Sequence, residues 1–292
     1  MPYNQHIRIY VPLRNEFDYP LNNSTERSEL PLLTFEQQKA RISRLNLMDD
    51  GFFQKIVQDM EICEEILRIL LKMPNLKVKS NQIERTIPIL TSKSVQLDLL
   101  CEDDDGNIIN VEVQKANDTD HQKRVRYNMA CMDTLSIDKG TNYHELPDLY
   151  IIYISAFDMF QQQKTTYHIH RAITETGTIV ENGTHEIYVN TKIDDGSDIA
   201  QLMQYFKNSN GINPLFKKLC NQVYYYKETP KGVNAMTDVW EEYADAKVAE
   251  QAKEASIFLL KEGIDPNIVA KANNLPLETV LQLQKEIQLE HV

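Results

Sequence analysis

Two stretches of the chain decide its fold: Val95-Gln96-Leu97-Asp98-Leu99-Leu100-Cys101 and Asn107-Ile108-Ile109-Asn110-Val111-Glu112-Val113-Gln114. Both are rich in apolar and β-branched residues, and the turn-forming sequence Asp103-Asp104-Asp105-Gly106 lies between them, so together they predict a β-hairpin. Each strand holds one carboxylate between apolar neighbours, Asp98 in the first and Glu112 in the second. Buried charge is costly unless it is paired or bound to a metal, so these two acids require an explanation.

The length of the turn decides whether the two carboxylates meet. A three-residue loop at 104–106 sets Asp98 opposite Glu112 and needs Gly106 in the left-handed conformation, which only glycine adopts without a Cβ penalty. A two-residue loop at 105–106 would shift the register by one residue and turn the carboxylates to opposite faces of the hairpin. We predict the three-residue loop.

In that register a third polar side chain joins the two acids. Residues i and i+2 of a strand share a face, so Gln114 points the same way as Glu112. Two carboxylates and an amide form an oxygen-rich set suited to Mg²⁺ or Mn²⁺, and without a metal the two like charges would raise the pKa of one carboxyl. The alternative is that Asp98 and Glu112 are ordinary polar positions of a half-exposed hairpin.

The composition is that of a soluble globular protein. The chain has 292 residues, 42% of them hydrophobic and 25% charged, with a net charge of −12. No apolar run approaches the ~18 residues that a membrane span needs, and the four cysteines form no CxxC pair, which together favour a cytoplasmic protein. The acidic balance argues against a protein that coats DNA, but it is compatible with an enzyme that meets DNA locally.

The rest of the chain predicts an α/β protein. Apolar residues at helical spacing follow Asp50, and a run buried on both faces, Leu149–Ser155, is typical of a central strand. Further expected elements are strands at 76–78, 83–90, 168–172 and 186–190, and helices at 62–71, 119–137, within 197–227 and from 231 to the end.

The order of these segments resembles the core of PD-(D/E)XK nucleases, and more narrowly the Rpn family of bacterial recombination-promoting nucleases, also described as transposases. The resemblance covers roughly residues 48 to 290. The segments that carry it are Met48-Asp49-Asp50-Gly51-Phe52-Phe53, Val95–Leu100, Asn110–Gln114, Arg124-Val125-Arg126-Tyr127 and Glu145-Leu146-Pro147-Asp148-Leu149-Tyr150-Ile151-Ile152.

The resemblance implies a fold and a chemistry. The fold would be a restriction-endonuclease-like α/β core, with a mixed central sheet flanked by helices and a C-terminal helical appendage. Asp98, Glu112 and Gln114 would be catalytic, and Asp98, Glu112 and the Val113 carbonyl would hold Mg²⁺ or Mn²⁺. Gln114 stands where the superfamily pattern has lysine, so no catalytic lysine is expected, and Lys115 points to the opposite face.

Two helices offer further candidates. Glu64 or Glu65 on the helix before the hairpin could add a carboxylate, but a solvated helix face is the favoured role for either. On the helix from 119, Arg124 and Tyr127 share a face, and with Lys123 they are the expected DNA contacts; a solvated helix front is the alternative.

The expected organisation has three parts: an N-terminal arm at 1–47, the nuclease core at 48–229 and a C-terminal helical region at 230–292. The last part has helix-turn-helix spacing but few cations, which favours packing or self-association into a homo-oligomer over DNA binding. The expected function is metal-dependent DNA cleavage that promotes recombination. The alternative is a decayed, catalytically inactive module that binds DNA or protein.

Overall fold

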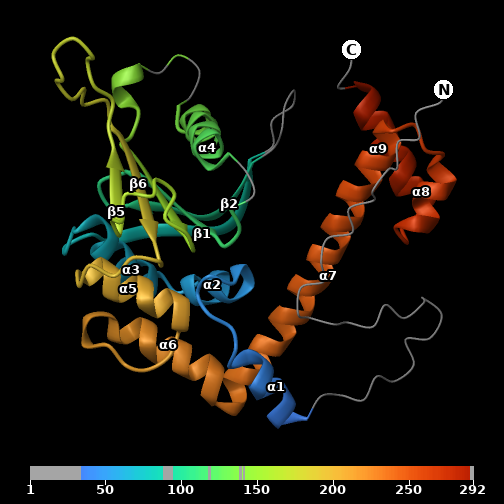
Figure 1. Ribbon diagram of the computed structural model, residues 1–292, viewed down its shortest axis with the longest axis horizontal. Coiled ribbons are helices and arrows are strands. Elements are labelled where there is room, and N and C mark those ends of the chain that lie inside the picture. Colours follow the sequence, from blue (N-terminus) through green and yellow to red (C-terminus); the bar gives the residue numbers. More distant parts are fainter. Residues whose placement is uncertain (1–33, 88–94, 118–119, 138–139, 141, 290–292) are drawn as a thin grey trace, which may run out of the picture. The chain divides into compact units, whose positions relative to one another are not determined.

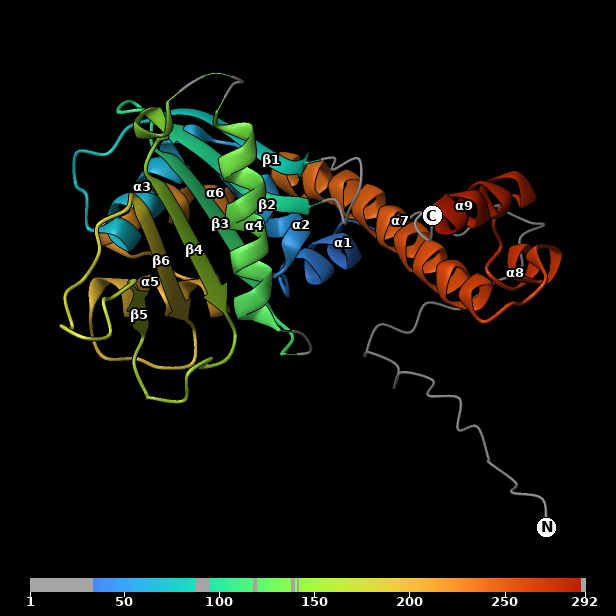
Figure 2. The same cartoon turned by 90° about the horizontal axis from the view of Figure 1, so that it is seen from above.

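The computed structural model describes residues 34–87, 95–117, 120–137, 140 and 142–289, and within these the chain builds one mixed six-stranded sheet. The strand order is β1-β2-β3-β4-β6-β5, with β3, β4 and β6 parallel and the other pairs antiparallel (Figure 2). The strand bounds are β1 Val78–Ile87, β2 Val95–Asp103, β3 Ile108–Gln114, β4 Leu149–Ser155, β5 Thr166–Ile169 and β6 Thr184–Asn190. All seven residues of β4 are buried, because helices cover both of its faces.

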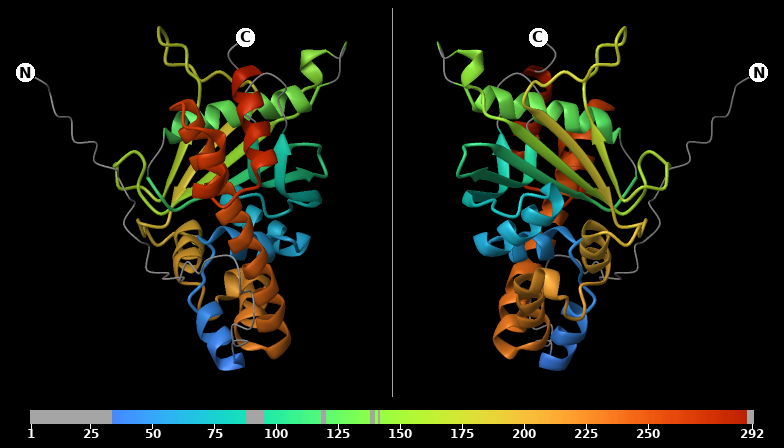
Figure 3. Two further views of the ribbon diagram at one scale, coloured as in Figure 1. Left: turned by 90° about the vertical axis from the view of Figure 1, so that its right-hand side faces the viewer. Right: turned by 90° about the vertical axis from the view of Figure 1, so that its left-hand side faces the viewer.

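Helices form a layer on each side of this sheet (Figures 2 and 3). One apolar cluster joins one face of the sheet to helices that include α2, α3, α5 and α6, and a second cluster joins the other face to α4. The bounds are α1 Phe35–Ile42, α2 Asp50–Val57, α3 Met60–Leu71, α4 His121–Leu135, α5 Asp198–Asn208 and α6 Lys217–Glu228, with short 3-10 turns at Tyr143–Glu145 and Pro214–Phe216. The expected restriction-endonuclease-like α/β fold is therefore confirmed.

The hairpin has the predicted turn. Asp103 and Asn107 close a three-residue loop through a hydrogen bond of 3.1 Å from the Asp103 N–H to the Asn107 carbonyl, and Gly106 has a φ of 83°. The Asp103 carboxylate accepts from the N–H groups of Asp105 and Asn107 at 3.0 and 2.8 Å, which fixes the turn from inside. The pairing then runs from Glu102–Ile108 to Leu99–Val111, so the next position sets Asp98 opposite Glu112.

The last part of the expected N-terminal arm, residues 35–47, packs against the core. Helix α1 occupies Phe35–Ile42, and Ile42, Leu45 and Leu47 are buried in the first cluster. The Leu47 N–H donates to the Phe206 carbonyl at 3.1 Å, which ties this segment to α5. Residues 1–33 lie outside the described residues. The strand expected at 168–172 forms earlier, at Thr166–Ile169, because its partner β6 ends its pairing at Glu186.

The C-terminal helices are α7 (Pro230–Lys261), α8 (Pro266–Ala272) and α9 (Leu277–Leu289). Helix α7 contacts α1, α2 and α6 near its start and α8 and α9 near its end (Figure 1). Val233 and Met236, in its first turns, are fully buried in the first cluster, whereas Leu260 joins a separate cluster with Val269 and Val280. The expected boundary at 230 therefore falls before two residues that complete the core of the preceding part.

Among the described residues, no helix combines the length and the apolar character that a membrane crossing requires.

Candidate active site

The two predicted carboxylates lie where β2 and β3 begin to separate. Backbone pairing of these strands ends at Leu99–Val111, and beyond it the Val113 N–H donates to Asp98 Oδ2 at 2.9 Å instead of to a backbone carbonyl. The side chain of Asp98 thus lies against the backbone of β3, next to the Glu112–Val113 peptide. The register predicted from the turn brings the two acids together, and the alternative in which they face opposite sides is excluded.

Glu112 is the buried member of the pair. Its side chain is 1% exposed. Desolvation and the negative charge of Asp98 raise the pKa of the Glu112 carboxyl to about 8, while Arg124 and a hydrogen bond from Asn110 act in the opposite direction. The expected rise in the pKa of one carboxyl is therefore present, with burial as its largest cause.

Arg124, on the first turn of α4, contacts two of the predicted site residues. Its Nη2 lies 3.2 Å from Glu112 Oε2 and its Nη1 lies 3.1 Å from Gln114 Oε1. Glu112 and Gln114 therefore share the face of β3 that α4 covers, as their spacing predicts. Asp120 caps α4 by accepting from the Lys123 N–H at 3.1 Å, so the helix begins at a fixed place and the arginine is held over the sheet.

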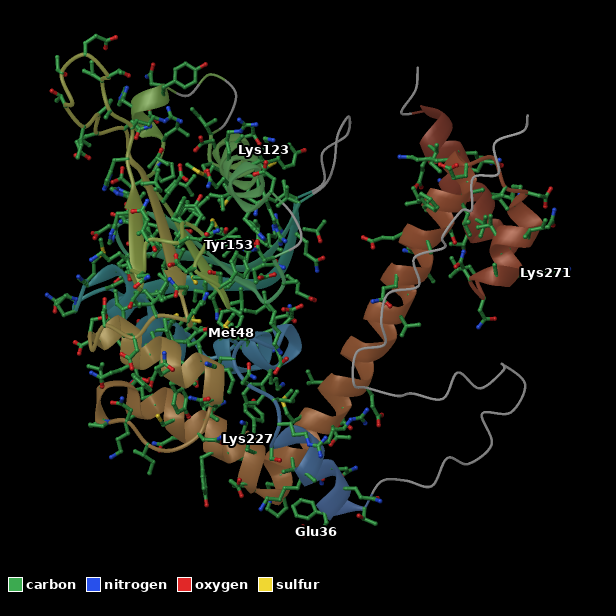
Figure 4. All side chains as sticks on the ribbon, in the orientation of Figure 1. Glu36, Met48, Lys123, Tyr153, Lys227 and Lys271 are labelled. Carbon is green, nitrogen blue, oxygen red and sulfur yellow. The ribbon has the colours of Figure 1, made fainter. Side chains whose placement is uncertain are left out.

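Two aromatic-ring residues at this site were not predicted. In β4, Tyr153 stands beside Glu112 in the parallel register and is 1% exposed. Its hydroxyl lies 2.7 Å from His121 Nδ1, and His121 Nε2 lies 3.2 Å from Asn117 Oδ1. Figure 4 labels Tyr153 within the sheet and Lys123 on α4 above it. Nothing local in the sequence marks this pair, because β4 becomes a neighbour of β3 only through the sheet.

Asn110 is a further residue that sequence reasoning missed. It is fully buried, and its Nδ2 donates to Glu112 Oε1 at 3.0 Å and to the Leu99 carbonyl at 3.1 Å. Its Oδ1 is buried without a hydrogen-bond partner among the described residues. A usable signal existed: Asn110 is two residues before Glu112 in the same strand, so the two side chains share a face.

The remaining candidates lie elsewhere or have other partners. Glu64 accepts from Arg68, Lys77 and the Val78 N–H, and Glu65 accepts from the Lys218 and Leu219 N–H groups at 3.2 and 2.7 Å. Both acids therefore anchor α3 to neighbouring elements, and these contacts involve neither Asp98 nor Glu112. The Glu64 side chain is only 12% exposed, so this acid does not lie on a fully solvated helix face.

On α4, the expected DNA contacts differ in exposure. Lys123 is 71% exposed and forms an ion pair of 2.8 Å with Asp120. Tyr127 is partly buried against the second apolar cluster. Lys115, which follows Gln114, forms an ion pair with Asp49, the residue that precedes α2, and thus points away from α4 as expected.

A mixed sheet with two carboxylates on neighbouring antiparallel strands, a Glu-x-Gln pattern and a covering helix that supplies an arginine defines a restriction-endonuclease-like nuclease fold. Residues 58–191 match the model of a family described as PD-(D/E)XK nuclease family transposase. The matched segment, just under half of the chain, contains β1 to β6, α3 and α4. The match confirms the resemblance to recombination-promoting nucleases and transposases of this superfamily.

No curated protein and no solved structure matches the chain.

The side chains at this site limit which metal ions it could bind. Within the residues that the structure describes, no group of three or more His, Cys, Asp or Glu side chains is placed to bind a metal ion. A cation at Asp98 and Glu112 would therefore need backbone, amide or water oxygens to complete its shell. PD-(D/E)XK nucleases typically use divalent metals, and hard ions such as Mg²⁺ keep several water ligands, so a site with two carboxylates fits them.

Proposed function

We propose that this protein is a divalent-metal-dependent endonuclease that hydrolyses DNA phosphodiester bonds in the bacterial cytoplasm, promoting recombination or serving a mobile element. One observation carries the proposal. Asp98 and Glu112 come together on adjacent strands, Glu112 is 1% exposed, and the charge of Asp98 helps to raise its pKa to about 8. The two carboxylates repel each other when both are ionised, and a divalent cation bound between them would remove this repulsion.

The residues present fit such a cation. Asp98 accepts from the Val113 N–H at 2.9 Å, which holds its carboxylate beside the peptide that carries the expected carbonyl ligand. Glu112 supplies a carboxylate, and the buried Asn110 Oδ1 is an oxygen without a hydrogen-bond partner in the described part of the chain. All of these are hard oxygen donors, which favour Mg²⁺ or Mn²⁺ over softer metals.

Each residue of the site would then have a separate role in the reaction. The chemistry supplied by a bound divalent cation is polarisation of the scissile phosphate and acidification of a water molecule. Gln114 can orient that water through its amide but cannot take its proton. Arg124, which already touches Glu112 and Gln114, is placed to donate charge-assisted hydrogen bonds to a phosphate oxygen.

A second candidate function is supported by the same arginine. Because Arg124 already partners the buried Glu112, the charge of this acid is balanced without a metal, as expected of an inactive module that binds DNA or protein. Self-association through the C-terminal helices is compatible with either function, since Ile268 and Leu281 on α8 and α9 are 60% and 41% exposed. Only turnover distinguishes the two candidates.

The test is nicking of supercoiled plasmid by the full chain in Mg²⁺, in Mn²⁺ and in EDTA. Cleavage is expected with either metal and not with EDTA. Asp98→Asn and Glu112→Gln keep the shape of each side chain and are expected to lower the rate by roughly 100-fold or more, because each removes a charged ligand. Asp105→Asn, at the exposed tip of the same hairpin, is the matched control and should cleave normally. Equal cleavage by all variants would remove the proposed site, and absence of cleavage with intact DNA binding would favour the inactive module.

A further inference from the structure

The loop that follows β4 has an unusual backbone. Gln161 and Gln163 both have a φ of 56°, in the left-handed region that residues with a Cβ seldom occupy. Such conformations persist only where the surrounding structure determines them, and they concentrate at binding and catalytic sites. The loop residues 161–164, called here the glutamine loop, are Gln161, Gln162, Gln163 and Lys164.

Two side chains hold the glutamine loop by its backbone. Asp158 accepts from the N–H groups of Gln161 and Gln163 at 3.1 and 2.8 Å, and the Tyr167 hydroxyl accepts from those of Gln162 and Lys164 at 3.2 and 3.1 Å. The Tyr167 hydroxyl in turn donates to Asp158 Oδ1 at 2.6 Å. All four N–H groups are thus bound by one Asp–Tyr pair, so the loop is rigid before any ligand arrives.

The side chains of the glutamine loop take no part in these contacts. All four residues are exposed, and their side chains have no hydrogen bond or ion pair with the described residues. The loop therefore presents three amides and one ammonium group on a fixed backbone. Because the loop backbone is already ordered in the free protein, a ligand would bind these side chains at a lower entropic cost.

This loop lies at the same end of the sheet as the candidate active site. The Ala156 N–H, at the end of β4, donates to the Gln114 carbonyl at 3.0 Å. The Phe157 ring lies 5.0 Å from the ring of His121, at the start of α4. The chain thus passes from contact with the strand end of β3 and the front of α4 directly into the loop. Ligands of sheets with parallel strands are commonly bound at this carboxyl end.

We propose that the glutamine loop is a DNA-contact element that decides which sequences the nuclease cuts; this rests on the proposed function. Lys164 contacts a backbone phosphate, where a point charge suffices. The glutamine amides each carry a donor and an acceptor and meet base edges, among which adenine offers the matching pair. Because the protein carries a net charge of −12, a few placed groups of this kind matter more than a general basic surface.

The phosphate contact is tested by salt dependence. The full-length protein binds a fluorescein-labelled random-sequence duplex in EDTA, and the affinity is measured by anisotropy from low to high salt. Lys164→Ala is expected to lower the slope of log affinity against log salt by about 0.9, the value for one phosphate contact. The matched control is Lys207→Ala, an exposed lysine of α5, a helix that packs on the sheet face opposite α4, and it should leave the slope unchanged. An unchanged slope in Lys164→Ala overturns the contact.

Sequence choice is tested by the glutamines. Sites cut in a randomised duplex library are sequenced for the wild type and for the triple variant Gln161→Ala, Gln162→Ala, Gln163→Ala, which keeps every backbone N–H. The ratio between the best and the worst sites is expected to fall about five-fold or more, the scale of one lost base contact. An identical site preference contradicts the proposal.

The rigidity of the loop has its own test. Tyr167→Phe removes the hydroxyl that binds Gln162, Lys164 and Asp158, and it is expected to speed amide exchange of residues 161–164 and to weaken DNA binding. Faster exchange with unchanged binding would overturn the role of a fixed loop. If the wild type never cleaves DNA but Lys164→Ala lowers the salt slope of binding, the proposed nuclease activity fails while the DNA contact of the loop stands. If wild-type cleavage is normal and all loop variants match it, only the inference fails.

Discussion

Arg124 of α4 and Glu112 of β3 form an ion pair across the candidate active site, with 3.2 Å between Nη2 and Oε2. The two partners differ in environment, because the Glu112 side chain is 1% exposed and that of Arg124 is 38% exposed. The arginine therefore neutralises a buried acid from the solvent side of the site. This pairing links the stability of the metal-free protein to the chemistry proposed for it.

Removing that arginine should cost more stability at high pH than at low pH. Below the Glu112 pKa of about 8 the carboxyl is largely protonated and needs no cation, whereas above it the buried charge does. Arg124→Ala is expected to lower the free energy of unfolding by about 1 kcal/mol at pH 9, a figure reduced because the arginine is partly exposed, and by less at pH 6. Urea titrations at both pH values measure this, with the exposed neighbour Arg126→Ala as control. A loss that is equal at both pH values would contradict the pairing.

Metal binding should release a proton near neutral pH. The folded pKa of Glu112, about 8, lies above the ~4.3 of an unfolded chain, so the stabilising effect of the bound proton is full below ~4.3 and is lost as pH rises through about 8. A cation must displace this proton, so roughly one proton should leave per Mn²⁺ bound at pH 7. Calorimetry in two buffers with different ionisation enthalpies measures the release. In Glu112→Gln it should vanish, and a heat that does not depend on buffer in the wild type would count against the assignment.

The turn that sets the register should depend on its glycine. At Gly106 a Cβ would meet nothing within 4 Å, but the φ of 83° is unfavourable to any L side chain. Gly106→Ala is therefore expected to lower the free energy of unfolding by about 1 kcal/mol while the hairpin register, and hence cleavage, is kept. Thermal unfolding measures the loss of stability, and the plasmid assay measures whether cleavage is kept. The neighbour Asp105→Ala is the control, and equal stability of the two variants would show that Gly106 is not required.

The turn was predictable because its conformation depends on a single residue, the glycine at position 106. Only glycine enters the left-handed position freely, and the register follows by counting back from Asp103 to Asp98. Glu112 and Gln114 could be placed on one face for a similarly local reason, the two-residue period of a strand. Arg124 could be named as a candidate from its helix, but its contact with Glu112 is a property of the packed sheet.

The features that the sequence did not predict depend mostly on contacts between segments that lie far apart in the chain. Tyr153 reaches the site because β4 pairs with β3 in parallel, after a crossover that local patterns do not position. Glu64 and Glu65 have the composition of a solvated helix face, yet α3 packs so that backbone N–H groups of β1 and α6 meet them. The first turns of α7 belong to the core because Val233 and Met236 fill it, which a boundary drawn at Pro230 misses.

Two truncations should separate the core from the C-terminal helices. A chain that ends at residue 239 keeps Val233 and Met236 and is expected to fold as a cooperative unit. A chain that ends at residue 229 loses both fully buried side chains and is expected to be several kcal/mol less stable or insoluble, because each deletion of a large core side chain costs about 2–5 kcal/mol. Solubility and urea unfolding of the two chains decide it. Equal stability would mean that α7 contributes nothing to the core.

The most direct test of the central claim is the position of a metal in a crystal. Crystals grown with Mn²⁺ and measured near the manganese absorption edge give an anomalous peak at the ion itself. We expect one peak between the carboxylates of Asp98 and Glu112, with metal–oxygen distances of roughly 2.0–2.6 Å, and with Arg124 withdrawn from Glu112 Oε2. A map without a peak there at saturating Mn²⁺, and with Arg124 still paired to Glu112, would contradict the metal site and with it the proposed nuclease.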